Sequence, residues 1–280
     1  MPGKNLPRQE GGSRKSGSGF KFIQVNLGKQ GPAHHTALQI AFESHADFLL
    51  LQEPSCPRNW VSGGYIALTH PAYHLVTPQR ITSLSNLQVK PRVLTYVRKA
   101  SSINFNPRYD LVEDPDLQIL EVIGPGPEPF LIANVYNERE RIEGSSQLGP
   151  TTVTRALLKI PLRSLQLPAL IAGDFNLHHF WWNSATEPAK AARALPLVRW
   201  LEENRATLLN DAEEIISKGG TLIRANLKAE SVIDLAFYTT FKKLVWRNWR
   251  YTEGISLDYE TITFEAVFNE PTLHAPPLLQ

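Results

Sequence analysis

The chain has very little cysteine: Cys56 is the only one among 280 residues. A single cysteine cannot form an internal disulfide, and it excludes a zinc site built from several cysteines. We expect Cys56 to be a structural thiol and not a nucleophile, because nothing near it in the sequence would lower its pKa. The histidine pairs at 34–35 and 178–179 do not indicate zinc either, since adjacent side chains should diverge and HExxH spacing is absent.

Long hydrophobic runs and a strong net charge are missing as well. No segment approaches the roughly 18 apolar residues that a membrane-spanning helix needs, and the amino terminus lacks the apolar region of a secretory signal. The formal net charge is +2, so nucleic acid would have to bind a local basic patch and not a global positive field. We therefore expect an intracellular protein that makes no membrane contact.

Hydrophobic residues make up 42% of the chain, which is enough for a sizeable core. Residues 1–18 contain almost no apolar side chain and predict a disordered tail. The proline-rich segment 271–280 predicts a second, flexible tail. Residues 19–270 are expected to form one domain.

The most informative stretch runs from Pro168 to His179. Its apolar part, residues 169–172, is bounded by proline and glycine, as expected for a strand buried on both faces. Asp174 and Asn176 follow two residues apart, so their side chains should project from one face where the apolar run stops. In open α/β sheets the ligand crevice lies at such strand ends. The same residues are also turn formers, and a simple turn explains them equally well.

The same pattern recurs along the chain. Apolar segments at 20–26, 47–53, 129–136 and 231–238 predict strands, and a helix over 33–44 joins the first two as a right-handed βαβ unit. Further strands are expected near 65–69, 73–77, 92–97, 117–123, 244–251 and 261–267, and further helices over 150–160 and 188–205. Burying polar groups at strand ends is costly unless they meet a cation or a ligand, and hard oxygen donors suit Mg²⁺ or Mn²⁺. The polar groups that these strands and one late loop carry are Asn26, Glu53, Asn134, Tyr136, Asp234 and Asp258.

Six motifs occur in a defined order: QVN at 24–26, LLLQEP at 49–54, ANVYNE at 133–138, AGDFNLHH at 172–179, SVIDLAF at 231–237 and SLDYETI at 256–262. Together they resemble the endonuclease/exonuclease/phosphatase superfamily, and most of all the apurinic-endonuclease-like domain of non-LTR (LINE-type) retrotransposons. The resemblance implies a DNase I-like α/β fold, a four-layer αββα sandwich of two mixed β-sheets flanked by helices. It also implies a monomeric, nuclear, Mg²⁺- or Mn²⁺-dependent endonuclease that nicks DNA.

The resemblance further implies which residues would hold the metal and the water. Glu53 would be the main metal ligand, with Asn26 and Asp258 beside it. Asp174 would align or deprotonate the attacking water. Asp234 matches the carboxylate that pairs with the family's catalytic histidine.

Other matching positions would bind the scissile phosphate. Asn176 would hold it directly, and His178 is assigned to it from the adjacent loop. Tyr136 would donate a hydrogen bond to a phosphate oxygen, and Asn134 would support that contact.

The closing triplet departs from the family pattern. Tyr259 stands where the family has a histidine, and a phenol with an ordinary pKa of about 10 cannot carry positive charge as an imidazole can. Losing such a group typically costs on the order of 10²–10⁴ in rate, so we expect impaired nicking. Two alternatives remain open: a catalytically inactive nucleic-acid-binding relic of a retroelement endonuclease, and a phosphatase of the superfamily.

Two aromatic clusters suit either base stacking or ordinary packing. Residues 242–251 interleave cations with aromatics, which fits nucleic-acid binding, although aromatics packed inward from a strand are more common. Trp181 and Trp182 follow the GDFNLHH run, where they would enter a groove or fix the loop.

Overall fold

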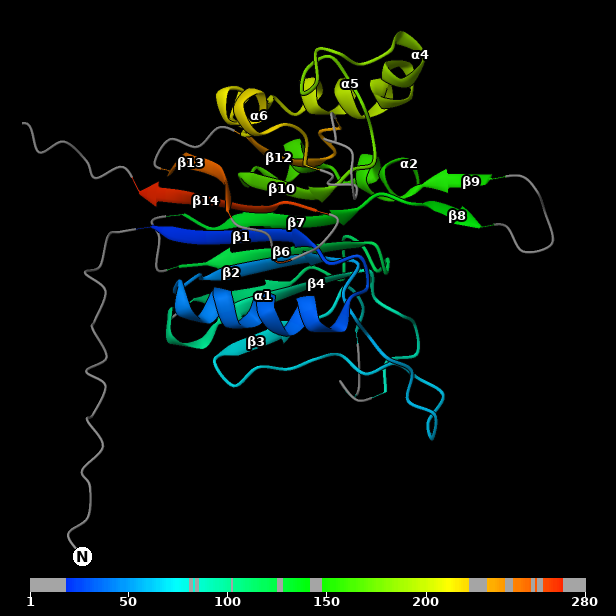
Figure 1. Ribbon diagram of the computed structural model, residues 1–280, viewed down its shortest axis with the longest axis vertical. Coiled ribbons are helices and arrows are strands. Elements are labelled where there is room, and N and C mark those ends of the chain that lie inside the picture. Colours follow the sequence, from blue (N-terminus) through cyan, green and yellow to red (C-terminus); the bar gives the residue numbers. More distant parts are fainter. Residues whose placement is uncertain are drawn as a thin grey trace, which may run out of the picture.

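The computed structural model of the chain (Figure 1) describes residues 19–80, 83, 86–101, 103–124, 128–141, 148–221, 231–239, 244–252, 255 and 259–268. The tails predicted at 1–18 and 271–280 lie outside the described residues, and so does Asp258. None of the described helices has the length and apolar character needed to cross a membrane.

Two mixed sheets of six strands form the middle of the fold. The first has the order β13 (Leu244–Thr252), β14 (Thr261–Phe268), β1 (Phe20–Asn26), β2 (Phe48–Gln52), β4 (Val93–Arg98) and β3 (Tyr73–Val76). The second has the order β11 (Ala206–Leu208), β12 (Asp234–Thr239), β10 (Ala169–Asp174), β7 (Phe130–Tyr136), β6 (Leu117–Ile123) and β5 (Asn104–Pro107). A separate hairpin, β8 (Arg139–Arg141) and β9 (Leu148–Thr151), projects from the end where β7 stops (Figure 1).

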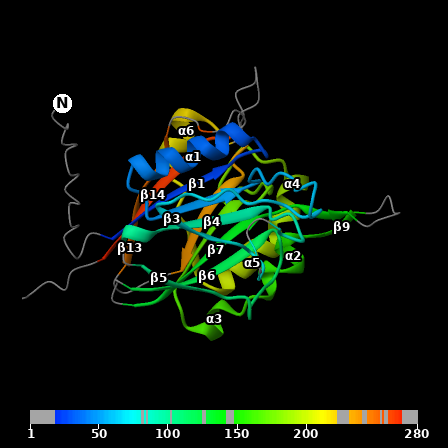
Figure 2. The same ribbon diagram turned by 90° about the horizontal axis from the view of Figure 1, so that it is seen from below.

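Helices cover the outer faces of both sheets, with α1 on the opposite side of the strands from α5 (Figure 2). Helix α1 (Gly31–Glu43) packs Ala37 and Leu38 on the first sheet. On the second sheet, α5 (Leu195–Glu203) packs Leu197 and Leu201. The remaining helical segments are η1 (Lys99–Ser101), α2 (Thr152–Arg155), η2 (Leu157–Lys159), α3 (Leu162–Leu165), α4 (Pro188–Ala191), η3 (Ala192–Ala194) and α6 (Ala212–Lys218).

The layer between the two sheets changes from apolar to polar along the strands. Because side chains alternate between the faces of a strand, every second residue of β1, β2, β7 and β10 points into this layer. Aromatic and aliphatic side chains such as Phe22, Phe48 and Leu170 fill one end. Further along the same strands the inward positions become Gln24, Gln52 and Asn134, all fully buried, and the polar residues of the site come last. The inward-facing series are Phe20, Phe22, Gln24 and Asn26 in β1; Phe48, Leu50 and Gln52 in β2; Phe130, Ile132, Asn134 and Tyr136 in β7; and Leu170, Ala172 and Asp174 in β10.

The aromatics of β13 pack inward, as the commoner interpretation of this segment predicted. Trp246 and Trp249 both lie in the layer between the sheets, although their spacing of three would place them on opposite faces of a regular strand. The register of β13 shifts between Arg247 and Arg250, and Asn248 has a φ of +57°. This irregularity supplies the extra residue that turns both indoles inward.

Several elements differ from the sequence prediction. The helix expected over 188–205 is divided into α4, η3 and α5, because Pro196 can occupy only the first turn of a new helix. The helix expected over 150–160 is reduced to α2 and η2. Only an isolated bridge at Tyr65 remains of the strand expected near 65–69. Strands β5, β8, β9 and β11 were not predicted.

Candidate active site

The strands of both sheets end or begin at one rim, and their registers align the polar residues there. Asp174 lies opposite Tyr136 on β7 and opposite Asp234 on β12, so three candidate residues share one row of the second sheet. In the first sheet Asn26 lies opposite Gln52, immediately before Glu53. Residues from five separate strands therefore reach the same end of the layer between the sheets.

Asp174 and Asn26 join the two sheets at this rim. The amide Nδ2 of Asn26 donates to Oδ2 of Asp174 at 2.8 Å, and the backbone N–H of Asn176 donates to Oδ1 at 2.9 Å. Neither Asp174 nor Asn26 exposes any surface. Gly173 makes the arrangement possible: its φ is +149°, and a Cβ there would lie 1.9 Å from the carbonyl oxygen of Val135 on β7.

Glu53 lies just beyond β2 in a strained backbone conformation, with a φ of +45°. Its backbone N–H donates to the carbonyl of Arg92 at 2.8 Å. Its carboxylate accepts a hydrogen bond from the phenol of Tyr136, and Oε1 lies 2.7 Å from Nζ of Lys29. A non-glycine residue with positive φ is worth a functional explanation, and here that conformation accompanies the placement of a carboxylate beside Tyr136.

Asp234 is buried at the rim, and a contribution from Thr221 only partly offsets the cost of that burial. Its exposed fraction is 1%, and neither carboxylate oxygen has a hydrogen-bond partner among the described residues. Burial and the charge of Asp174 raise the pKa of Asp234 well above its usual range. A buried carboxylate with so little hydrogen bonding is expensive, so this position favours a hydrogen-bonding or cationic partner.

The other titratable groups at the rim are also shifted. Burial, and then the charge of Glu53, raises the pKa of Asp174 to about 7. Burial and the nearby charges of Glu53 and Asp174 raise the pKa of Tyr136 above its ordinary value, and Tyr259 adds to that shift. Perturbed pKa values of this kind concentrate at functional sites.

Tyr259 and Asn176 both lie at the surface of this rim. Tyr259 is half-buried and electrostatically coupled to Tyr136. Asn176 is exposed, with a φ of +48°, and its amide Nδ2 donates to the carbonyl of Asn137 at 3.2 Å. The carboxamide of Asn176 is therefore held at the edge of the site within reach of solvent.

The predicted phosphate contact Asn134 lies in the interior of the fold. The amide of Asn134 donates to the carbonyls of Leu51 and Leu94, and its oxygen accepts from Gln52 at 2.6 Å. This side chain links the two sheets in the interior, because its strand position precedes the rim by two residues. His178 lies near Lys190 and Glu187 at α4, and burial together with Lys190 lowers its pKa. Its assignment to the phosphate stays a prediction.

Trp181 and Trp182 differ in exposure in the loop after β10. Trp182 is buried, packs on Phe237 and donates from its indole Nε1 to the carbonyl of Leu177 at 3.1 Å, so it fixes the loop. Trp181 keeps an exposed fraction of 43%. Cys56 is buried, and burial raises its pKa to about 11, as expected for a structural thiol.

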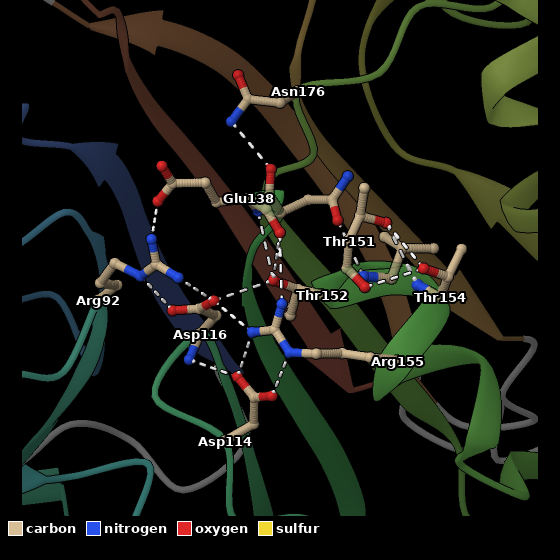
Figure 3. A network of polar contacts seen from close by, with 11 residues as sticks. Arg92, Asp114, Asp116, Glu138, Thr151, Thr152, Thr154, Arg155 and Asn176 are labelled. Atoms are coloured by element: carbon tan, nitrogen blue, oxygen red, sulfur yellow. Dashed lines mark hydrogen bonds and ion pairs between the residues drawn. The ribbon is translucent and has the colours of Figure 1, made fainter. Parts of the chain in front are cut away.

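A network of ionic side chains next to Tyr136 was not found from the sequence (Figure 3). It contains Arg92, which precedes β4, and Asp116, which precedes β6. Its other charged members are Arg155 of α2, Asp114 and Glu138. Only Glu138, in the ANVYNE motif, carried a sequence signal, because the other members come from segments that look like ordinary charged loops.

The donor set at the rim fits Mg²⁺ better than zinc. Among the described residues, no three His, Cys, Asp or Glu side chains are close enough to hold a metal ion by themselves. Mg²⁺ commonly takes one or two carboxylates and completes its coordination with waters and substrate phosphate. Glu53 supplies a carboxylate, and the ammonium of Lys29 already forms an ion pair with it. The Oδ1 atom of Asn26 accepts from the N–H of Gly28 and retains a second lone pair.

Comparisons with known proteins agree with this architecture. The family model described as endonuclease-reverse transcriptase matches residues 130–258. The endonuclease domain of TRAS1, a telomere-specific non-LTR retrotransposon, superimposes with a TM-score of 0.64 at 15% identity, covering 90% of this chain and 100% of that one. No curated protein matches the chain in sequence.

Two further solved proteins have similar structures. The AP endonuclease LMAP from Leishmania major has a TM-score of 0.57 at 10% identity, with coverage of 90% of this chain and 89% of that one. The catalytic domain of Xenopus laevis APE2 has a TM-score of 0.55 at 13% identity, with coverage of 90% and 94%. These likenesses confirm the predicted DNase I-like sandwich of two mixed sheets between helices.

Proposed function

We propose that this chain, a member of the endonuclease/exonuclease/phosphatase superfamily, is a metal-dependent phosphodiester hydrolase that nicks DNA, and that Tyr259 limits its rate. The observation that carries the proposal is the hydrogen bond from Asn26 to Asp174, which joins the two sheets at the rim where Glu53 and Tyr136 also meet. We further propose that the protein acts as a monomer in the nucleus, where a DNA substrate would lie.

In this proposal Glu53 and the free lone pair of Asn26 hold a divalent cation, Mg²⁺ or Mn²⁺, and Asp258 is assigned as a further ligand. When bound, such a cation offsets negative charge on phosphoryl oxygens and acidifies a water. The rim already favours positive charge next to Glu53, since Lys29 makes its ion pair there.

The protein's own groups would handle the proton and the phosphate. Asp174 accepts two hydrogen bonds that fix both of its oxygens, so it is oriented to receive a proton from an attacking water. The exposed amide of Asn176 and the phenol of Tyr136 are the donors available to the phosphate oxygens. No covalent intermediate is required.

Tyr259 explains why we expect the activity to be impaired. The family pattern pairs an aspartate at position 234 with a histidine at position 259, and here the carboxylate of Asp234 has no hydrogen-bond partner among the described residues. Without an imidazole at position 259, the site lacks a group next to Asp234 that can take up and release a proton near neutral pH. The same observation favours a second candidate function, a nucleic-acid-binding module that has lost catalysis.

Nicking of supercoiled plasmid separates these proposals. Wild-type protein is incubated with Mg²⁺, with Mn²⁺ or with EDTA, beside the Asp174→Asn variant, which keeps the size of the side chain and removes its base. Metal-dependent nicking that disappears in the variant supports the enzyme. DNA binding without any nicking supports the inactive module, and hydrolysis of inositol phosphates or nucleotides in place of DNA would indicate a superfamily phosphatase.

A further inference from the structure

We infer that Arg92 is a positioning residue of this site, which fixes the ring of Tyr136 through its guanidinium and the backbone of Glu53 through its carbonyl. The inference rests on the proposed phosphodiesterase function. Arg92 does not belong to any of the strand-end motifs, and it lies directly before β4.

The backbone of Arg92 connects Glu53 to the second sheet. Its carbonyl accepts from the N–H of Glu53 at 2.8 Å, and its own N–H donates to the carbonyl of Pro115 at 2.8 Å. Glu53 has a positive φ, a conformation that persists only when the surroundings enforce it. The carbonyl of Arg92 is one of the contacts that enforce it.

The side chain of Arg92 lies over Tyr136. Its guanidinium carbon is 5.5 Å from the centroid of the Tyr136 ring, which is a cation–π distance. Nε and Nη2 bind the two oxygens of Asp116, and Nη1 binds Glu138 (Figure 3). Because a guanidinium is planar and the Asp116 pair is bidentate, these contacts fix the plane of the group that covers the ring.

Asp116 holds both partners of this stack. Its carboxylate is fully buried and binds Arg92, and its backbone carbonyl accepts from the N–H of Tyr136 at 2.8 Å. The hydroxyl of Thr152 also donates to Asp116, at 3.2 Å. Asp116 thereby fixes the backbone of Tyr136, and Arg92 covers one face of its ring. The hydroxyl of Tyr136 donates to Glu53.

The network is not itself a phosphate-binding site. Two guanidinium groups, Arg92 and Arg155, face three carboxylates, Asp114, Asp116 and Glu138. The net charge of this cluster is therefore negative, and Nε, Nη1 and Nη2 of Arg92 are all engaged. Arg92 orients its neighbours and leaves the phosphate to Asn176 and Tyr136.

Arg155 provides a matched control within the same cluster. It binds Asp114 in a bidentate manner at 2.8 Å and also reaches Asp116, and it is as buried as Arg92, with 17% of its side chain exposed against 26%. No contact joins Arg155 to the Tyr136 ring among the interactions of the described residues. Its substitution removes an ion pair to Asp116, as substitution of Arg92 does, but it leaves the Arg92 guanidinium over the Tyr136 ring.

The first test compares Arg92→Lys and Arg92→Ala with Arg155→Lys and Arg155→Ala in plasmid nicking. Small displacements of positioned groups cost up to about 10²-fold in rate, so we expect both Arg92 variants to lose about 10- to 100-fold in kcat with KM within about twofold. The Arg155 variants should stay within about threefold in kcat. Guanidinium at millimolar concentration should restore part of the activity of Arg92→Ala and none of any loss in Arg155→Ala. Equal losses at the two positions, or no rescue, would overturn the inference.

A second test reads the ring of Tyr136 without using activity. The protein is labelled with 3-fluorotyrosine, and Tyr136→Phe identifies the ¹⁹F resonance. We expect both Arg92→Lys and Arg92→Ala to shift or broaden this resonance, whereas Arg155→Lys leaves it in place. An unchanged resonance in a folded Arg92 variant would show that the guanidinium does not hold the ring. If wild-type protein does not nick DNA at all, the proposed function fails, and this measurement still decides the role of Arg92.

Discussion

Asn26 and Asp174 are 148 residues apart in the chain and share a buried hydrogen bond of 2.8 Å between the two sheets. Each residue lies at the end of its own strand, so the contact fixes the two strand ends relative to each other. The bond uses the amide nitrogen of Asn26, while its oxygen accepts from the N–H of Gly28 at 2.9 Å. A site made in this way requires that both sheets keep their registers.

Replacing Tyr259 with histidine should raise nicking of supercoiled DNA at least about tenfold, because the imidazole supplies a cationic donor and gives the buried Asp234 a partner. Initial rates in Mg²⁺ measure the effect. Tyr259→Phe, which has the ring without a donor, should show no gain. The double variant Asp234→Asn with Tyr259→His should lose most of the gain, and equal rates in the single and double variants would show that no pairing is involved.

Replacing Lys29 with glutamine should tighten binding of Mn²⁺. The ammonium lies 2.7 Å from Glu53 and competes for its carboxylate, but more than half of the lysine side chain is exposed, so screening limits the effect to about 1 kcal/mol, or about fivefold in Kd. Titration calorimetry and Mn²⁺ electron paramagnetic resonance measure it. Lys190 has a similar exposed ion pair with Glu187, and Lys190→Gln should leave Kd unchanged. Weaker binding in Lys29→Gln would contradict the assignment of Glu53 as a ligand.

Replacing Asp234 with asparagine should stabilise the protein more at high pH than at low pH. Because its folded-state pKa is raised, the folded chain holds a proton that the unfolded chain has released, so wild-type stability declines as pH rises toward the folded pKa. The variant has no such proton to lose. Urea unfolding at pH 5.5 and pH 8.5 should show that the gain from Asp234→Asn is larger at pH 8.5 by at least about 1 kcal/mol. A gain that does not depend on pH would exclude this titration.

His34 should cause the opposite dependence on pH. Burial lowers its pKa to about 4, and its ring bonds the hydroxyl of Tyr96 at 2.9 Å. Between pH 6.5 and 4 the unfolded chain binds a proton that the folded chain excludes, so stability is lost as pH falls. The free energy of unfolding relative to His34→Gln should drop by about 2 kcal/mol between pH 7 and pH 4.5. His35→Gln, at the exposed neighbour, should follow the wild-type curve.

The strands around the site were predictable because their local signals are strong. The apolar run before Asp174 and the run before Tyr136 both appear as strands β10 and β7 at the expected positions. Parallel pairing of these two strands then places the two side chains opposite each other. Local pattern and sheet geometry were sufficient for this part of the rim.

The features of the site that the sequence did not predict depend on contacts between residues far apart in the chain. Asn134 has the same spacing from Tyr136 as Asp174 has from Asn176, yet its amide is consumed by Gln52 and by carbonyls of the first sheet. Arg92 and Asp116 lie in turns before their strands, and their pairing depends on how the two sheets face each other. No periodicity within a single segment encodes such a contact.

The layer between the sheets is apolar at one end and polar at the other, so the residues that stabilise the fold and the residues of the site lie at different ends. Packing is concentrated around Phe22, Phe48 and Phe264, whose rings stack with centroids about 5 Å apart, at the far end from Asp174 and Asp234. Residues at the polar end can therefore change while the domain continues to fold. Such a scaffold can outlast its original reaction and remain available for a new one.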